Sequence, residues 1–207
     1  TGRPVKARMT RQEVFTSSRT RHNMVTRIRL GADREGRLNG VDLYALSNTG
    51  AYGTHGLTVA CNVGMRTLVL FNCPNLRFKS DVVYTNLPVA GAYRGYGGTQ
   101  GIFVTAVAID ELARKLDMDP VDFYLKNIIA PNSEVPILGE LGEGEVIGSP
   151  RVGSCELAAC IRTGAEEFGW EEKRANQKKQ TGRYRRGIGM AVMMQGSSIP
   201  YIDMGSA

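Results

Sequence analysis

The amino-acid sequence predicts an α+β fold with antiparallel or mixed strands in the N-terminal half, helices mainly in residues 99–169, and one further strand near the C-terminus. Apolar residues recur at every second position in several segments before residue 99, which is the period of a half-buried strand. After a glycine-rich stretch the period lengthens to that of an amphipathic helix. Because strands and helices are grouped along the chain, an alternating βαβ arrangement is not expected.

Four segments of the N-terminal half carry the strand pattern: 5–9, 24–30, 38–46 and 77–85. A hairpin is expected to join the second and third, because the loop 33–37 contains Gly36, and glycine adopts positive φ readily. Thr10 and Glu13 have the spacing of a capping box, which predicts a short helical turn through Phe15.

Three helices are expected in the second half of the chain. Apolar residues over 102–116 lie on one helical face and predict a helix of about five turns. Asp119 and Pro120 supply an N-cap and a first-turn proline for the next helix. Ser154 is expected to cap a third helix that ends near Gly169.

The remaining C-terminal segments differ in composition. Residues 131–153 are rich in Gly, Pro and Glu and are expected to form a long surface connection. Residues 171–186 are polar and basic, whereas the apolar run 188–194 predicts a buried strand.

The domain organisation predicted is a single piece, 1–207, excised from a larger domain. Neither end has the polar linker expected at a domain boundary, and the first residue is not Met. We expect a β-rich lobe at about 1–98, a helical part at about 99–186 and a terminal strand at about 187–195.

Composition indicates a globular protein in a reducing compartment. The hydrophobic share of 42% and the charged share of 22% are those of globular domains. Apolar runs stay well short of the ~20 residues that a membrane-spanning helix needs. The four cysteines form no CxxC pair, which favours free thiols and a cytoplasmic location.

The net charge of +6 raises nucleic-acid binding as a competing function. Basic residues cluster near the C-terminal end: Lys173, Arg174, Lys178, Lys179, Arg183, Arg185 and Arg186. Few aromatic residues are interleaved with them, and the patterns of a recognition helix, an RRM or a KH domain are missing. A solvated basic surface is therefore the favoured interpretation, and a nucleic-acid-binding module the alternative.

The segment GAYRGYGGTQG, residues 91–101, is the strongest candidate for chemistry. Glycines at 95, 97 and 98 allow close backbone approach, and the helix that follows favours an anion at its N-terminus. Arg94 offers five donors for anionic oxygens, and the ring of Tyr96 can stack on a planar heterocycle. Gln100 occupies the third glycine position of a dinucleotide-binding fingerprint, so this is not one. A tight strand-to-helix turn with a surface arginine and a packed tyrosine remains the alternative.

The same segment resembles the G-A-(Tyr/Phe)-R-G-(Tyr/Phe)-G-x-(Pro)-Q stretch of the molybdenum hydroxylases, the family of xanthine dehydrogenases and aldehyde oxidases. The resemblance is collinear along nearly the whole chain, which is more specific than one motif. Further matching stretches are TGRPV (1–5), NTGAYGTHG (48–56), CPN (73–75), VVYTNLP (82–88), DELARKL (110–116), DPVDFYLKN (119–127) and RGIGMA (186–191).

The resemblance implies part of a molybdopterin-binding catalytic subunit that oxidises purine-like N-heterocycles or aldehydes with water as the oxygen source. It implies a molybdenum–molybdopterin cofactor in the complete enzyme, with 2Fe-2S and FAD in partner domains or subunits. The chain alone is expected to hold no cofactor and to be inactive. A naturally split lobe of a multisubunit oxidoreductase remains an alternative.

The resemblance also implies roles for individual residues. Tyr93, Arg94 and Gly95 match positions beside the cofactor, and Tyr96 matches an aromatic residue that stacks on the substrate ring. The family's glutamate base belongs to a segment after residue 207, so no catalytic residue and no metal ligand is assigned to this chain.

Other polar residues receive no functional assignment. Arg66 lies where xanthine-specific members carry a substrate-orienting arginine, but the spacing to Cys73 is shorter here. His22 and His55 are isolated and are more typical of hydrogen-bonded structural residues than of ligands. Asp117 replaces a common helix-ending glycine, which aspartate tolerates because it can adopt a left-handed backbone.

Overall fold

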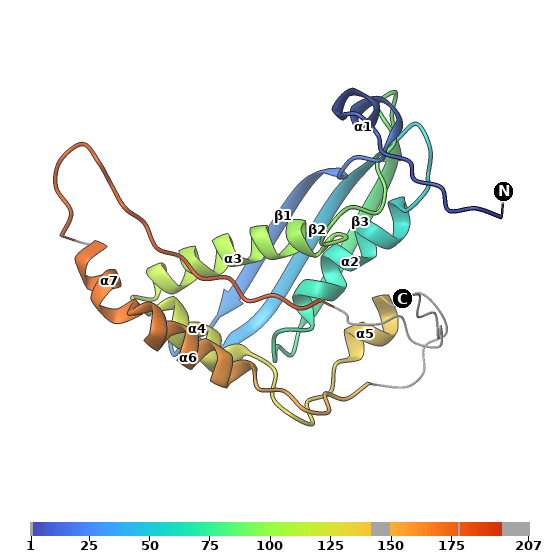
Figure 1. Ribbon diagram of the computed structural model, residues 1–207. Coiled ribbons are helices and arrows are strands. Elements are labelled where there is room, and N and C mark those ends of the chain that lie inside the picture. The colour runs from blue at the N-terminus through green and yellow to red at the C-terminus, as the bar shows by residue number, and fades with distance from the viewer. Residues whose placement is uncertain (1, 142–149, 178, 196–207) are drawn as a thin grey trace.

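The computed structural model describes residues 2–141, 150–177 and 179–195. Three strands form one sheet in the order β1 (Asn23–Ala32), β2 (Leu38–Gly50), β3 (Leu76–Tyr84). β1 and β2 are antiparallel, whereas β2 and β3 are parallel, so the predicted mixed sheet is confirmed. Figure 1 shows α2 (Gly56–Leu68) and α3 (Gly98–Lys115) lying across one face of this sheet. The α+β class is confirmed.

Apolar and polar side chains alternate along β2, so one face of the strand is buried and the other is more exposed. Val41, Leu43 and Ala45 are buried beneath the helices, while Asp42 and Tyr44 lie on the opposite face among charged neighbours. The hairpin between β1 and β2 is as predicted, because Gly36 adopts φ 79° and its amide donates to the carbonyl of Asp33.

α2 was not predicted from the sequence, and it creates a β2–α2–β3 crossover between parallel strands. The sequence did not predict this single βαβ unit, although the fold as a whole is α+β and not an alternating βαβ arrangement, as expected. The glycines of α2 hide its helical pattern, because glycine lowers helix propensity. Gly64 has a packing reason: a Cβ there would lie 2.6 Å from the Phe78 ring of β3.

Two apolar clusters hold the helices to the sheet. One lies between the sheet and α2, and also receives residues that precede and begin α5 (Pro136–Leu141). The other lies at the far end of α3, around α4 (Pro120–Asn127) and α6 (Leu157–Phe168). Buried members of the two clusters include Leu43, Val63, Leu68 and Val69 in the first and Ile109, Phe123 and Tyr124 in the second.

The predicted helix caps were mostly correct. Thr10 and Glu13 form the capping box of α1 (Arg11–Ser17), and Asp119 caps α4 by accepting from the Val121 amide at 2.8 Å. Gly169 ends α6 in the left-handed region at φ 69°. Ser154 does not cap α6, because the helix begins later and its N-cap position is Glu156.

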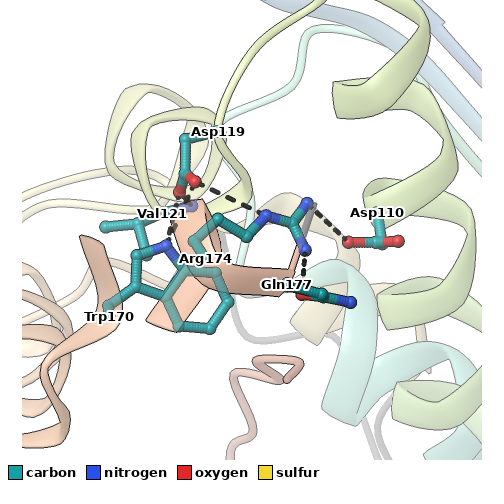
Figure 2. A network of polar contacts seen from close by, with 6 residues as sticks. All are labelled: Asp110, Asp119, Val121, Trp170, Arg174 and Gln177. Carbon is teal, nitrogen blue, oxygen red and sulfur yellow. Dashed lines mark hydrogen bonds and ion pairs between the residues drawn. The ribbon is translucent and has the colours of Figure 1, made fainter. Parts of the chain in front are cut away.

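α7 (Trp170–Gln177) lies inside the stretch expected to be only polar and basic. Figure 2 shows how its side chains reach α4: the Trp170 indole donates to both carboxylate oxygens of Asp119, at 2.9 and 3.1 Å. Arg174 lies between Asp119 and Asp110 at 3.9 and 3.7 Å. These contacts attach the C-terminal helices to the α3–α4 corner.

Two predicted strands are absent from the described residues. Residues 2–10 are exposed and form no strand, so the pattern over 5–9 was misleading. Residues 187–195 also form no strand, although Val192 is buried against α4 and α6, so the predicted terminal strand is wrong. An apolar pattern in the sequence favours an extended segment, but it does not show that another strand lies beside that segment to pair with it. The connection 131–153 contains α5, and its residues 142–149 lie outside the described residues.

Candidate functional site

The glycine-rich loop joins β3 to α3 through three successive residues with positive φ. Gly95, Tyr96 and Gly97 adopt φ 88°, 42° and 91°. Two tight turns fix the loop, since the Tyr96 amide donates to Tyr93 and the Gly98 amide donates to Gly95, both at 2.8 Å. A left-handed conformation costs a non-glycine residue about 1–2 kcal/mol. Tyr96 is therefore a strained position.

One of the glycines expected to admit a ligand, Gly97, packs closely against α2. A Cβ on Gly97 would lie 2.3 Å from the Val59 carbonyl oxygen, whereas one on Gly98 would make an ordinary contact at 3.4 Å with the Arg66 side chain. Gly101, one turn into α3, is as close to α2 as Gly97, since a Cβ there would lie 2.4 Å from the Val63 carbonyl oxygen. Close packing of α2 against α3 therefore accounts for Gly97 and Gly101, a purpose that sequence reasoning did not foresee.

The Tyr96 side chain points at the beginning of α2. Its hydroxyl lies 2.6 Å from Nδ1 of His55 and 2.6 Å from Oγ1 of Thr58. The His55 and Tyr96 rings meet edge to face, with centroids 5.6 Å apart. The hydrogen-bonded role expected for His55 is confirmed, and its partner is the loop tyrosine.

A chain of hydrogen bonds between polar residues continues along α2 from that contact. Asn62 donates to the Thr58 carbonyl at 2.9 Å, and Nε of Arg66 donates to Oδ1 of Asn62 at 2.8 Å. Burial lowers the pKa of the Arg66 guanidinium from its usual value. Arg66 thus lies further along α2 and makes no hydrogen bond with Tyr96 among the contacts described.

Arg94 points outward from the loop. Its side chain is exposed and has no hydrogen-bond or ion-pair partner in the described part of the chain. Its carbonyl oxygen accepts a 2.5 Å hydrogen bond from Arg21, which also donates to Thr99 and lies 4.7 Å from the Tyr93 ring centroid. Arg21 was missed by sequence reasoning, because nothing in its local sequence marks a residue that clamps a loop far along the chain.

His22, next to Arg21, contradicts the expectation of a hydrogen-bonded histidine. Its side chain is 3% exposed, and neither ring nitrogen has a partner among the described residues. Burial lowers the pKa of His22, and the charge of His55 adds to this effect. A buried, neutral imidazole with two unpaired nitrogens therefore lies behind the loop.

The described residues contain no group of three or more His, Cys, Asp or Glu side chains that could hold a metal ion. None of the four cysteines, all of which lie in the described ranges, forms a disulfide. Among the described helices, none has both the length and the apolar character to cross a membrane. The chemical interest of the site therefore lies in its arginines, aromatic rings and backbone amides.

Comparison with known proteins places the chain in one family. A family model described as the molybdopterin cofactor-binding domain matches residues 1–128. The probable hypoxanthine oxidase XdhD of Escherichia coli K12 is 40% identical over 98% of the chain, which spans 21% of that protein. The xanthine dehydrogenase molybdenum-binding subunit of Escherichia coli O157:H7 is 37% identical over 92% of the chain, which spans 24% of that protein.

A solved structure of an aldehyde oxidoreductase has the same fold over most of the chain. The aldehyde oxidoreductase of Desulfovibrio gigas superposes on 84% of the chain with a TM-score of 0.69 and 25% identity, and the matched part is 18% of that protein. The chain thus spans about a fifth to a quarter of the length of these relatives. It belongs to the molybdopterin cofactor-binding domain family of the molybdenum hydroxylases.

Proposed function

We propose that this chain forms one wall of the cofactor and substrate site of a xanthine-dehydrogenase-like hydroxylase. The observation that carries the proposal is that the Arg94 side chain has no partner among residues 2–141, 150–177 and 179–195, while the backbone of its loop is held by Arg21 and α2. An exposed guanidinium on a rigid support is suited to bind a separate anionic group. Membership of the molybdopterin cofactor-binding domain family supports the choice of molybdopterin as that group.

The donor set of the loop fits an anionic cofactor. Arg94 offers the planar fork of its guanidinium, with Tyr93 and Gly95 on either side in the chain. The N-terminus of the 18-residue helix α3 follows and adds the positive end of its dipole. When bound, the molybdenum cofactor supplies the two-electron oxidation that adds oxygen from water to a carbon atom.

Tyr96 presents the ring for the substrate. Its hydroxyl is held by α2, so the ring can contact a planar molecule without rotating away. Relatives named for hypoxanthine and xanthine, both planar purines, favour an N-heterocycle over an aldehyde as the substrate class. The chain's part in catalysis is to bind and orient, because we assign the catalytic base to a segment outside it.

The rest of the enzyme completes the site in this proposal. We assign 2Fe-2S and FAD to partner domains or subunits that remove electrons from the molybdenum centre, and we place the complete protein in the cytoplasm, where free thiols persist. Residues 1–207 act as one part of the larger cofactor-binding domain. Alone, they hold only one wall and are expected neither to retain molybdenum nor to turn over substrate.

Nucleic-acid binding has less support. Lys173 donates to the Phe168 carbonyl and lies over that ring, while Arg174 lies between two aspartates. Two members of the basic cluster are therefore engaged within the molecule, and Lys178 lies outside the described residues. Recognition of phosphates needs basic side chains that are free to reach them.

The test is the molybdenum content of the complete protein, expressed in a host that makes the cofactor. Arg94→Ala is expected to lower molybdenum per protein molecule, or to slow turnover of every substrate alike. Arg94→Lys should recover only part of the loss, because an ammonium lacks the planar fork. Arg34→Ala removes an exposed arginine in the β1–β2 hairpin and serves as the control. Full metal and wild-type turnover in Arg94→Ala would refute the assignment.

A further inference from the structure

Two polar side chains at the start of α2 reach the Tyr96 hydroxyl on another element, although the Thr58 hydroxyl also lies 3.3 Å from the His55 carbonyl oxygen. His55 occupies the N-cap position but makes no side-chain hydrogen bond to the helix. A residue at this position commonly satisfies the free amides of the first turn. Here Nδ1 of His55 and Oγ1 of Thr58 both lie 2.6 Å from the Tyr96 hydroxyl on another element.

The two contacts complete the hydrogen bonding of the phenol. A phenol has one proton to donate and accepts through its oxygen. With two partners it donates to one and accepts from the other, so its oxygen is fixed in direction as well as in distance. The oxygen lies on the axis about which the ring turns, so the two contacts fix the direction of that axis. The phenolic O–H lies in the plane of the ring, and the His55 ring meets the Tyr96 ring edge to face at 80°, so the same two residues also restrict the plane of the ring.

The backbone of Tyr96 makes such an anchor necessary. A non-glycine residue at φ 42° persists when the surrounding structure over-determines it, and such residues gather at functional sites. The two tight turns and the contact of Gly97 with α2 hold the backbone of the loop, but they do not restrict the side-chain torsions of Tyr96. Without the two contacts of its hydroxyl, the ring would be free to take other rotamers.

We infer that His55 and Thr58 are positioning residues, which clamp the Tyr96 hydroxyl and thereby set the orientation in which its ring stacks on a planar heterocyclic substrate. The inference rests on the proposed function of Tyr96 as the substrate-stacking residue. It assigns a substrate-orienting task to the start of α2, acting through the Tyr96 side chain.

The experiment uses the complete, molybdenum-loaded protein with hypoxanthine as the probe. Its Kd is measured by calorimetry on dithionite-reduced protein, which cannot accept electrons from the probe, and kcat and KM are measured on oxidised protein. His55→Ala and Thr58→Val each remove one hydrogen bond to the Tyr96 hydroxyl. We expect Kd to rise and kcat/KM to fall by roughly 3–10-fold each. Molybdenum content and melting temperature should stay at the wild-type values.

Conservative variants separate positioning from general damage. His55→Asn keeps a hydrogen-bonding atom near the position of Nδ1, and Thr58→Ser keeps the hydroxyl, so both should return to within about twofold of wild type. The double variant Tyr96→Phe with His55→Ala should be no worse than Tyr96→Phe alone, because the two changes remove the same bond.

The outcomes distinguish two failures. Wild-type Kd and kcat/KM in Tyr96→Ala would overturn the proposed function of Tyr96 and this inference with it. A clear defect in Tyr96→Ala beside wild-type values in both His55→Ala and Thr58→Val would overturn the inference alone. Loss of molybdenum or of several degrees of melting temperature in those two variants would also overturn it, in favour of a structural role.

Discussion

Two polar clusters join helices in this molecule, and they differ in what they leave unpaired. In the helix-end cluster of Asp119, Trp170 and Arg174, Asp119 accepts from the Val121 amide and from the Trp170 indole, and Arg174 lies between two carboxylates. In the loop region the Tyr96 hydroxyl is satisfied, but within the part of the chain that the structure describes Arg94 is exposed without a partner and the His22 ring is buried without one. A cluster whose polar groups are paired with one another stabilises the fold, whereas a cluster with unpaired groups leaves them available to another molecule.

The backbones of the two regions differ in the same way. Asp119 adopts an ordinary extended N-cap conformation, and α4 continues normally from it. The loop instead has three consecutive positive φ values, one of them at Tyr96. Strain of this kind persists where function requires a geometry that ordinary turns do not provide. The following predictions test whether the two regions depend on different kinds of interaction.

The largest stability effect is expected at the α2–α3 contact beneath the loop. Gly97→Ala places a Cβ 2.3 Å from the Val59 carbonyl oxygen and forces alanine to φ 91°. Overpacking costs about 1–3 kcal/mol and the left-handed backbone about 1–2 kcal/mol. Urea unfolding of the chain should therefore show a loss of about 2–5 kcal/mol. Gly98→Ala is the matched control, since its Cβ would have ordinary contacts at 3.4 Å. Equal losses in the two variants would contradict the packing account.

The next effect is expected in the helix-end cluster. Asp119→Ala removes the N-cap of α4, worth about 1 kcal/mol, and leaves the buried Trp170 N–H without its acceptor, which costs about 1–3 kcal/mol. The free energy of unfolding should fall by about 2–4 kcal/mol. Asp122→Ala removes an exposed carboxylate from the same first turn and should cost less than about 1 kcal/mol. A neutral Asp119→Ala would show that the network in Figure 2 contributes nothing to stability.

A smaller effect is expected from pH at Tyr124, close to the helix-end cluster. Burial raises the pKa of the Tyr124 phenol to about 12, the Val192 backbone opposes this, and the charge of Asp110 adds to it. The folded state therefore holds this proton more tightly than the unfolded state, whose phenol titrates near its ordinary value of 10.0. Stability is fully present below pH 10 and is lost as pH rises toward 12, by roughly 1.4 kcal/mol per pH unit.

Unfolding measured from pH 9 to 12 checks this expectation. Tyr124→Phe should remove that part of the alkaline decline, while Tyr184→Phe, which alters an exposed phenol, should leave the decline unchanged. An unchanged decline in Tyr124→Phe would mean that the buried phenol is not the group responsible.

The sequence predicted those parts of the fold that depend on local chemistry. The capping box of α1, the Asp119 cap, the Gly36 hairpin and the left-handed Asp117 all follow from the conformational preferences of single residues. α2 was not predicted because Gly64 lowers its helix propensity. Glycine is needed there to leave room for the Phe78 ring of β3, which the local sequence does not reveal. The terminal strand failed because a strand needs a neighbouring strand, which the apolar run 188–194 does not encode.

The sequence predicted which segment forms the candidate site, but not which residues from other parts of the chain contact it. The sequence and the family resemblance singled out residues 91–101, and Arg94 is exposed with no partner among the described residues, while its binding role stays a prediction. The partners of the loop could not be predicted, because Arg21, His55 and Thr58 reach it across separations that no local pattern records. Long-range contacts depend on how the helices pack, and that is decided by the whole chain.

The most direct test of the central claim compares Tyr96→Ala with Asp119→Ala in the complete protein. kcat/KM per molybdenum atom and melting temperature are measured on the same preparations. If the loop serves substrate binding and the helix-end cluster serves stability, Tyr96→Ala should lose roughly tenfold or more in kcat/KM and keep its molybdenum and melting temperature. Asp119→Ala should melt several degrees lower and keep its kcat/KM per molybdenum. Wild-type kcat/KM in Tyr96→Ala, or the same loss of kcat/KM in both variants, would contradict the account.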